Sequence, residues 1–378
     1  MSITPPSARI SIGATIGSAI ALWPASLPRG PVPAILLTAA CVLVATTVVR
    51  LSGTARPGSR VFGWSAAAMF AVVLVAGAVM DVLWQNIIRV DAGTTTIGAG
   101  YGAGLVAAGA AGMAAVTWFP RRTAIAALAA LTVTGLFASP AASAAATQSD
   151  RASDTEVAAR ALTDRWLHAD GLHKGAVVIA VPTGSGWVDP EATTALRARL
   201  HGDVAFLSLP YASTASWRVF VTDREAAGNS AIAVLRRVLA ARDTLPPTAS
   251  RPKVYLYGQS LGALGADRAR AWAEAHHPGA VTGTVLVGVP ADTVDPHGGA
   301  GARIVLANAS DPVTRWSLAS LWRPPSRPDE TRTVGRAVHR PPWLPVVSFV
   351  QTSVDLLASL DGPDGTGHHY GPEQGVLP

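Results

Sequence analysis

The sequence predicts two parts: a bundle of transmembrane helices over residues 1–147, followed by an α/β domain with a mainly parallel sheet over residues 148–378. Five apolar stretches in series predict the first part. Buried strands that alternate with helical stretches predict the second, because this order is typical of a parallel sheet covered by helices on both faces. A length of about 230 residues is ordinary for such a domain.

The composition differs between the two parts. Of the 378 residues, 49% are hydrophobic and 14% charged, which is too apolar for one soluble domain. Residues 1–150 carry +5 of the formal net charge of +6. The high pI is therefore largely a property of the first part, and no basic stripe with interleaved aromatic residues predicts a nucleic-acid partner. The single cysteine, Cys41, excludes an intramolecular disulfide and a cysteine metal cluster.

Each apolar stretch approaches or exceeds the ~18–20 residues that a helix needs to cross a bilayer. The stretches are Ile10–Leu27, Val32–Val49, Val61–Trp84, Ile97–Phe119 and Thr123–Ala146. The first is the weakest, since Pro24 interrupts it. Glycines in the fourth stretch suit close contact between helices in lipid. A buried helical bundle in a soluble protein is the alternative, but five such runs in series favour a lipid bilayer as the partner.

The loop arginines predict the orientation. With a cytoplasmic N-terminus, six arginines lie inside and two, Arg29 and Arg89, lie outside, in agreement with the positive-inside rule. The inside set is Arg9, Arg50, Arg56, Arg60, Arg121 and Arg122. Five crossings then place the C-terminal domain on the extracytoplasmic face of the plasma membrane.

The fifth stretch has a second interpretation. Arg121 and Arg122, the apolar run and the small residues at 142–146 also resemble a signal peptide with its cleavage site. We favour an uncleaved helix, because signal peptides normally begin a chain.

In the third stretch, Asp81 is an intramembrane carboxylate and Asp91 follows shortly after it. Such a carboxylate is a candidate functional group, although we expect solvation at the helix end to explain Asp81.

The second part begins after a polar linker near residues 148–156. The predicted strands are Ala176–Val181, Val204–Leu209, a strand from about Lys253 to Gly258, Thr284–Val289 and Arg303–Ala307. The predicted helices are Thr155–Asp170, Glu191–Leu200, Asp223–Arg242, Ala263–His276 and Trp343–Leu360.

The motif Gly258-Gln259-Ser260-Leu261-Gly262 lies between a strand and an alanine-rich helix. A sharp turn there needs small residues two positions before and after the serine, and it exposes the hydroxyl at a helix N-terminus. This context favours Ser260 as a nucleophile over a merely structural turn. The backbone N–H of Leu261 and one from the Thr183-Gly184-Ser185 loop would form the oxyanion hole.

A serine nucleophile needs an imidazole to take its proton and a carboxylate to orient the imidazole. Asp311 follows the predicted strand Arg303–Ala307, and His368 and His369 lie in a glycine-flanked loop near the C-terminus. Serine, acid and histidine in this order are typical of an α/β-hydrolase. Three further acids are alternatives: Asp355, Asp361 and Asp364. The two histidines lack matching metal-ligand spacing, so we expect neither a metal nor another cofactor.

Several motifs together resemble the actinobacterial membrane-anchored α/β-hydrolase family. They are residues 23–29 at the N-terminus, 183–189, 216–217, 251–253 leading into 258–262, 311–313, 343–345, and Gly367-His368-x-Tyr370. The resemblance spans nearly the whole chain. It implies Ser260 as nucleophile, Asp311 as acid and His368, rather than the alternative base His369, as the base. Two positions depart from the family pattern: Gln259, where glutamate is frequent, and Thr366, where a histidine occurs.

These observations favour a membrane-anchored serine hydrolase that cleaves a lipid or cell-envelope ester through an acyl-enzyme. An acyltransferase would use the same triad, because water access decides between the two reactions. A non-catalytic membrane scaffold with a retained hydrolase fold is the alternative of another class. A transporter is disfavoured, since paired intramembrane charges are lacking. The Trp- and Pro-rich region 312–367 could be a lid over the site or a structural excursion.

Overall fold

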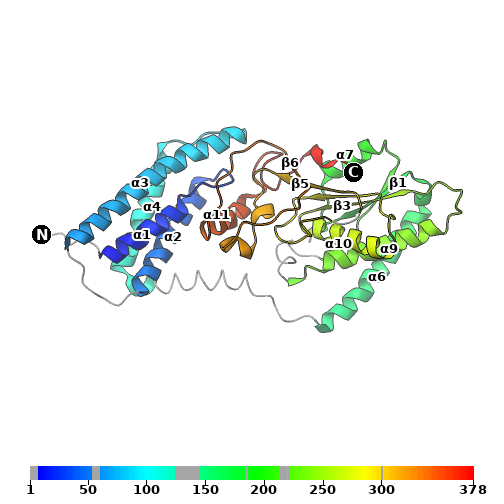
Figure 1. Ribbon diagram of the computed structural model, residues 1–378, viewed down its shortest axis with the longest axis horizontal. Helices are drawn as coiled ribbons and strands as arrows, with labels where there is room; N and C mark the ends of the chain where they lie inside the picture. The colour runs from blue at the N-terminus through cyan, green and yellow to red at the C-terminus, as the bar shows by residue number, and fades with distance from the viewer. Residues whose placement is uncertain are drawn as a thin grey trace. The chain divides into compact units, whose positions relative to one another are not determined.

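A computed structural model describes residues 7–52, 60–123, 145–183, 186–212, 219, 222–298 and 301–378. The chain forms two compact units (Figure 1). The first consists of Met1–Ser139, Leu318–Pro324 and Ala337–Pro363, and the second of Pro140–Ser317, Pro325–Arg336 and Asp364–Pro378. The first unit thus includes two segments of the 312–367 region that the sequence analysis assigned to the C-terminal domain.

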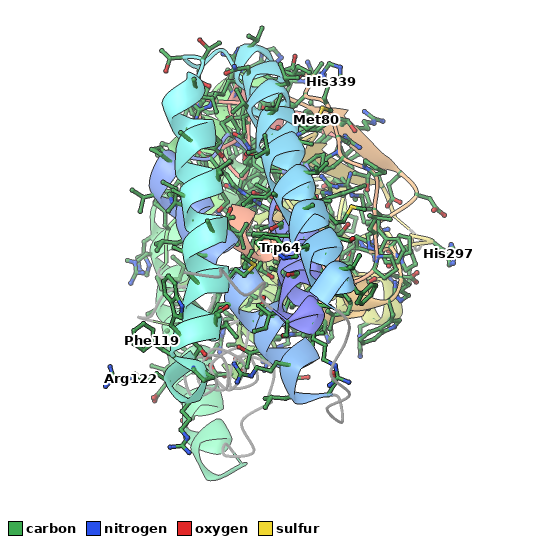
Figure 2. The ribbon with its side chains drawn as sticks, turned by 90° about the vertical axis from the view of Figure 1, so that its left-hand side faces the viewer. Trp64, Met80, Phe119, Arg122, His297 and His339 are labelled. Atoms are coloured by element: carbon green, nitrogen blue, oxygen red, sulfur yellow. The ribbon has the colours of Figure 1, made fainter. Side chains whose placement is uncertain are left out.

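Among the described residues, four helices form the body of the first unit: α1 (Ala8–Ala21), α2 (Pro31–Leu51), α3 (Arg60–Asp91) and α4 (Ala99–Trp118). Of these, α2, α3 and α4 are long and apolar enough to cross a membrane. Large apolar side chains on α3, including Trp64 and Met80, point away from the bundle, as does Phe119 after α4 (Figure 2). The predicted fifth crossing falls mainly on residues 124–144, outside the described residues.

The first predicted crossing is shorter than expected. With 14 residues α1 has a length of about 21 Å, less than the ~30 Å of a bilayer's hydrocarbon core. The helix ends at Ala21, before the Trp23-Pro24 pair, because proline disfavours helical backbone at the residue before it.

Two glycines of α1, spaced four apart, bring it against α2. A Cβ on Gly13 would lie 2.5 Å from Thr46 Cα, and one on Gly17 would lie 2.5 Å from Val42 Cα. Close packing of this kind is what small residues at a four-residue spacing provide in lipid. The glycines of the fourth apolar stretch differ in their surroundings: a Cβ on Gly109 would meet the Leu74 side chain and one on Gly112 the Ala39 carbonyl, while Gly98 and Gly100 face open space.

Polar groups gather at the end of the bundle where α1 and α3 finish. Trp84 donates its indole N–H to Ala25 O at 2.8 Å, and Arg89 Nη2 donates to Arg29 O at 2.7 Å. The Arg29 side chain in turn forms a buried ion pair with Asp355 at 2.7 Å. Asp355 ends α11 (Val347–Asp355), so this pair ties a C-terminal segment to the loop between α1 and α2.

The expectation that Asp81 is solvated at the helix end is wrong. Asp81 is buried, because it lies on the side of α3 that packs inside the bundle. Asp91, by contrast, lies at the end of α3 and accepts a hydrogen bond from His339 Nδ1 at 2.7 Å. Figure 2 shows His339 at this end of the bundle.

The second unit contains a six-stranded, entirely parallel sheet in the order β2-β1-β3-β4-β5-β6. The strands are β1 (Ala176–Val181), β2 (Val204–Leu207), β3 (Lys253–Gln259), β4 (Gly283–Val287), β5 (Arg303–Asn308) and β6 (Thr331–Val334). Five of them were predicted. Strand β6 was missed, because it has four residues, alternates threonine with arginine and valine, and lies at the sheet edge.

Alternate residues of each strand enter two cores, as expected for a sheet covered on both faces. On one face, Val177, Ile179 and Leu256 pack against α9 (Ala226–Asp243) and α10 (Leu261–His276). On the other face, Val178, Tyr257 and Leu306 pack with Leu196 of α7 (Pro190–Arg199). Helix α6 (Ala145–His168) packs against α9 (Figure 1).

The described residues also form short 3₁₀ helices: η1 (Gly171–His173), η2 (Val313–Arg315), η3 (Leu318–Leu321), η4 (Leu356–Ala358) and η5 (Pro372–Gln374).

The glycine contact between α1 and α2 predicts a position-specific loss of stability. Gly17→Leu should lower the free energy of unfolding by ~1–3 kcal/mol or more, because the new side chain would overlap backbone atoms of Cys41 and Val42. Thermal unfolding in detergent measures this effect. Gly100→Leu is the matched control, since nothing lies within 4 Å of a Cβ there. Equal unfolding temperatures for the two variants would contradict the packing account.

Candidate active site

The candidate nucleophile lies on a strained turn. Ser260 joins β3 to α10 and has φ 55° and ψ −124°, a conformation that side-chain-bearing residues rarely adopt. Its N–H donates to Val287 O at 2.9 Å, which fixes the turn to the end of the neighbouring strand β4. Such a turn presents a serine hydroxyl at the carboxyl edge of a parallel sheet, where catalytic groups of this architecture lie.

The two flanking glycines are sterically required. A Cβ on Gly258 would lie 2.2 Å from Gly262 O, and a Cβ on Gly262 would lie 2.3 Å from Val181 O. Either contact is far inside van der Waals distance. The spacing of the motif therefore follows from the tight approach of the turn to its own helix and to the end of β1.

Asp311 and His368 lie together although they are far apart in the chain. His368 Nδ1 is 2.8 Å from Asp311 Oδ2, and both side chains are buried. The other ring nitrogen, Nε2, is also buried and has no hydrogen-bond partner among the described residues. The carboxylate thus fixes the imidazole by one nitrogen and leaves the second available for proton transfer.

No hydrogen bond joins Ser260 Oγ to His368 Nε2 in this structure. The two residues are nevertheless linked through their neighbours. Gln259 Nε2 donates to His368 O at 3.4 Å, and the Ser260 N–H is bonded to β4 one residue before Gly288, which contacts the His368 ring. Hydrogen bonds of a catalytic group are commonly long or absent until substrate binds.

Every oxygen of the Asp311 carboxylate has a donor. Oδ1 accepts from Val313 N–H at 2.8 Å, while Oδ2 accepts from Tyr370 Oη at 2.6 Å as well as from His368. Burial, together with the negative charge of Asp311, raises the pKa of the Tyr370 phenol well above its usual value. The phenol therefore stays protonated at neutral and moderately alkaline pH and remains a donor to the carboxylate.

The loop that carries His368 is held to the end of β5. Asn308 Nδ2 donates to Gly367 O at 3.1 Å and to His369 O at 2.9 Å. Ser310 Oγ accepts from Gly367 N–H at 2.9 Å, and Tyr370 Oη accepts from Asn308 N–H at 3.1 Å. The strand that delivers Asp311 thus also positions the base.

Gly288 provides the space for the histidine–aspartate pair. It follows β4 with φ 57°, and a Cβ there would lie 2.6 Å from His368 Cε1 and 3.1 Å from Asp311 Oδ2. Any larger residue would displace the imidazole from the carboxylate. Gly288, Asn308 and Ser310 were not predicted from the sequence as parts of the site. Their position at the carboxyl ends of β4 and β5 is the signal that could have found them.

The alternative acids and base lie elsewhere. His369 Nε2 is 3.2 Å from Asp364 Oδ1 in a largely exposed pair. Asp355 belongs to the buried ion pair with Arg29, and Asp361 is exposed. Of the predicted acids and bases, Asp311 and His368 form a buried pair, whereas Asp364 and His369 form an exposed one.

The predicted oxyanion hole is described in part. Leu261 is the first residue of α10, so its N–H has no acceptor in a preceding helical turn and points from the positive end of the helix. The N–H of Thr183 donates to Trp187 O at 2.9 Å and is engaged in the loop after β1. Gly184 and Ser185 lie outside the described residues. The oxyanion hole stays a prediction.

A family model described as "Alpha/beta-hydrolase family" matches residues 145–297 and 295–376, which is more than half of the chain. Neither the curated proteins nor the solved structures gave a match.

Tyr370 and His368 both donate to Asp311 Oδ2, which predicts that Tyr370 helps to position the carboxylate against the imidazole. A hydrogen bond to a charged group contributes ~1.5–3 kcal/mol, so Tyr370→Phe should slow the reaction of Ser260 with a fluorophosphonate roughly tenfold or more. Labelling rates measured on purified protein test this.

Tyr257→Phe is the matched control. Tyr257 is equally buried, and its phenol donates to Gln374 Oε1 at 2.6 Å rather than to Asp311. An equal loss of rate in both variants would indicate a general structural effect, and an unchanged rate in Tyr370→Phe would contradict the positioning role.

Proposed function

Because the chain belongs to the alpha/beta-hydrolase family, we propose that it is a membrane-anchored serine hydrolase with Ser260, His368 and Asp311 as its catalytic triad. The observation that carries the proposal is the buried His368–Asp311 hydrogen bond, with His368 Nε2 left unpartnered among the described residues. The strained turn at Ser260 supports it independently, since strain of this kind is retained at functional sites.

In the proposed mechanism, Ser260 Oγ attacks the carbonyl carbon of an ester while His368 Nε2 takes the hydroxyl proton. Asp311 stabilises the resulting imidazolium, and the N–H of Leu261 donates to the oxyanion. Collapse of the tetrahedral intermediate breaks the bond to the alcohol, which leaves with the proton from His368. A water molecule then hydrolyses the acyl-enzyme by the same steps, and the carboxylic acid is released.

We propose a lipid or cell-envelope ester as the substrate class. Helices α2, α3 and α4, each long and apolar enough to cross a membrane, support this class, because an enzyme tethered to a bilayer can reach substrates that stay in it. No cofactor or metal takes part in the proposed reaction.

We also propose that the hydrolase domain is extracytoplasmic, at the plasma membrane. In the first unit, Arg29 and Arg89 lie at one end of the bundle, where Arg89 donates to the Arg29 carbonyl. Arg50 lies at the opposite end and donates to Val116 O near the end of α4. That end, where α1 and α3 begin and α4 finishes, also holds Arg9, Arg60, Arg121 and Arg122. The end with fewer bundle arginines, where α11 docks, is therefore the one expected outside the cytoplasm.

Labelling of membranes with a fluorophosphonate probe tests the nucleophile. Wild-type protein should be labelled, and Ser260→Ala should lose the label completely, because only an activated serine reacts at an appreciable rate. Gel fluorescence of the purified band gives the readout.

The two adjacent histidines provide a matched pair for the same assay. His368→Ala should abolish labelling, while His369→Ala should retain it, since His369 pairs with Asp364 instead of Asp311. Retention of the label in Ser260→Ala, or its absence from folded wild-type protein, would contradict the proposed nucleophile.

A further inference from the structure

The part of the first unit that comes from the 312–367 region combines buried polar residues with exposed large apolar ones. Segments 318–324 and 337–363 belong to the same compact unit as the apolar helices. On α11, the buried side chains are Gln351, Thr352 and Asp355. Three large apolar side chains of these segments are exposed: Leu357 is 83% exposed, Leu360 66% and Trp322 65%. Arg323, His339 and Arg340 of the same segments are exposed as well.

The inward polar groups satisfy the backbone at the end of the helix bundle. Gln351 Nε2 donates to the carbonyls of Ile20 and Ala21 at 2.6 and 3.1 Å, which are the last carbonyls of α1. Helical carbonyls at this position lack an intrahelical partner. Asp355 accepts from the backbone N–H of Ser26 at 2.9 Å, in addition to the ion pair with Arg29.

These contacts are of the kind that a non-aqueous environment requires. In lipid, every backbone polar group must find a partner within the protein, because water is absent. In water the opposite arrangement is expected, with polar residues of a short helix outward and its leucines in a core. Because the polar side chains of α11 are buried while Leu357 of η4 and Leu360 after it are exposed, we infer that the leucine-bearing face does not contact water.

The position of the segments identifies what covers this face. They pack at the end of the bundle where α3 ends and α4 begins, as the bonds from His339 to Asp91 and from Gln351 to α1 show. Helix α3 exposes large apolar side chains along its length, and α4 exposes Trp118 at its end, as expected of lipid-facing helices (Figure 2). A leucine-bearing turn at the end of such helices lies at the depth of the lipid headgroups and upper acyl chains.

We propose that Leu357, Leu360 and Trp322 insert into the interfacial region of the same bilayer that the apolar helices span. The chain between the proposed acid, Asp311, and the proposed base, His368, is thereby attached to a lipid surface. This inference rests on the membrane anchoring proposed above and does not depend on catalysis by Ser260.

Site-specific fluorescence tests the insertion directly. Because Cys41 is the single cysteine, Cys41→Ser provides a background in which Leu357→Cys carries one nitrobenzoxadiazole probe. Two reference positions accompany it: Val72→Cys on the exposed face of α3, and Ala240→Cys on the exposed surface of α9. The full-length protein is reconstituted into phosphatidylcholine–phosphatidylglycerol vesicles with and without doxyl-labelled lipid.

We expect doxyl lipid to quench the probe at 357 about as strongly as the probe at 72, with protection from aqueous iodide. The probe at 240 should show the reverse. Iodide quenching at 357 without doxyl quenching would overturn the inference, and so would protection from both quenchers, which would indicate a protein surface there. If the probe at 72 also escapes the doxyl lipid, the proposed membrane anchoring fails with it, whereas failure of catalysis would leave these signals unchanged.

Discussion

The hydrogen bond between His368 and Asp311 is the contact on which the proposed chemistry of the second unit depends. It joins the end of β5 to a loop near the C-terminus, and the surrounding residues serve its geometry. Tyr370 donates to the same carboxylate oxygen, Asn308 and Ser310 hold the loop, and Gly288 leaves room for the ring. A buried carboxylate is stable only with such partners, so the network also accounts for how Asp311 can be fully buried.

The buried ion pair between Arg29 and Asp355 has a structural role in the first unit. Arg29 and Asp355 pair at the end of the helix bundle and satisfy nearby backbone groups. A buried pair of this kind adds little net stability over apolar packing, but loss of either partner is costly. The pair therefore acts mainly to specify where α11 docks. The chain leaves the sheet of the second unit after Asp311. Segments 318–324 and 337–363 then belong to the first unit, and the chain is again part of the second unit from Asp364 on, where His368 lies.

The parallel sheet and the turn at Ser260 could be predicted from the sequence, for physical reasons. The parallel sheet is evident because its strands are buried on both faces and read as continuous apolar runs, as in Ala176–Val181. The turn at Ser260 is evident because its glycines are sterically required. Strand β6 is short and half-exposed, and it carries no such signal. The association of α11 with the first unit depends on Asp355 meeting Arg29 across the length of the chain, and no local pattern encodes that contact.

The central claim, acyl transfer through Ser260, is tested most directly by trapping the intermediate. The protein is mixed with a short-chain p-nitrophenyl ester, quenched in acid during turnover, digested and analysed by mass spectrometry. The account predicts one acylated peptide, with the acyl group on Ser260. Ester turnover with Ser260 unmodified, or with the acyl group on another residue, would contradict it.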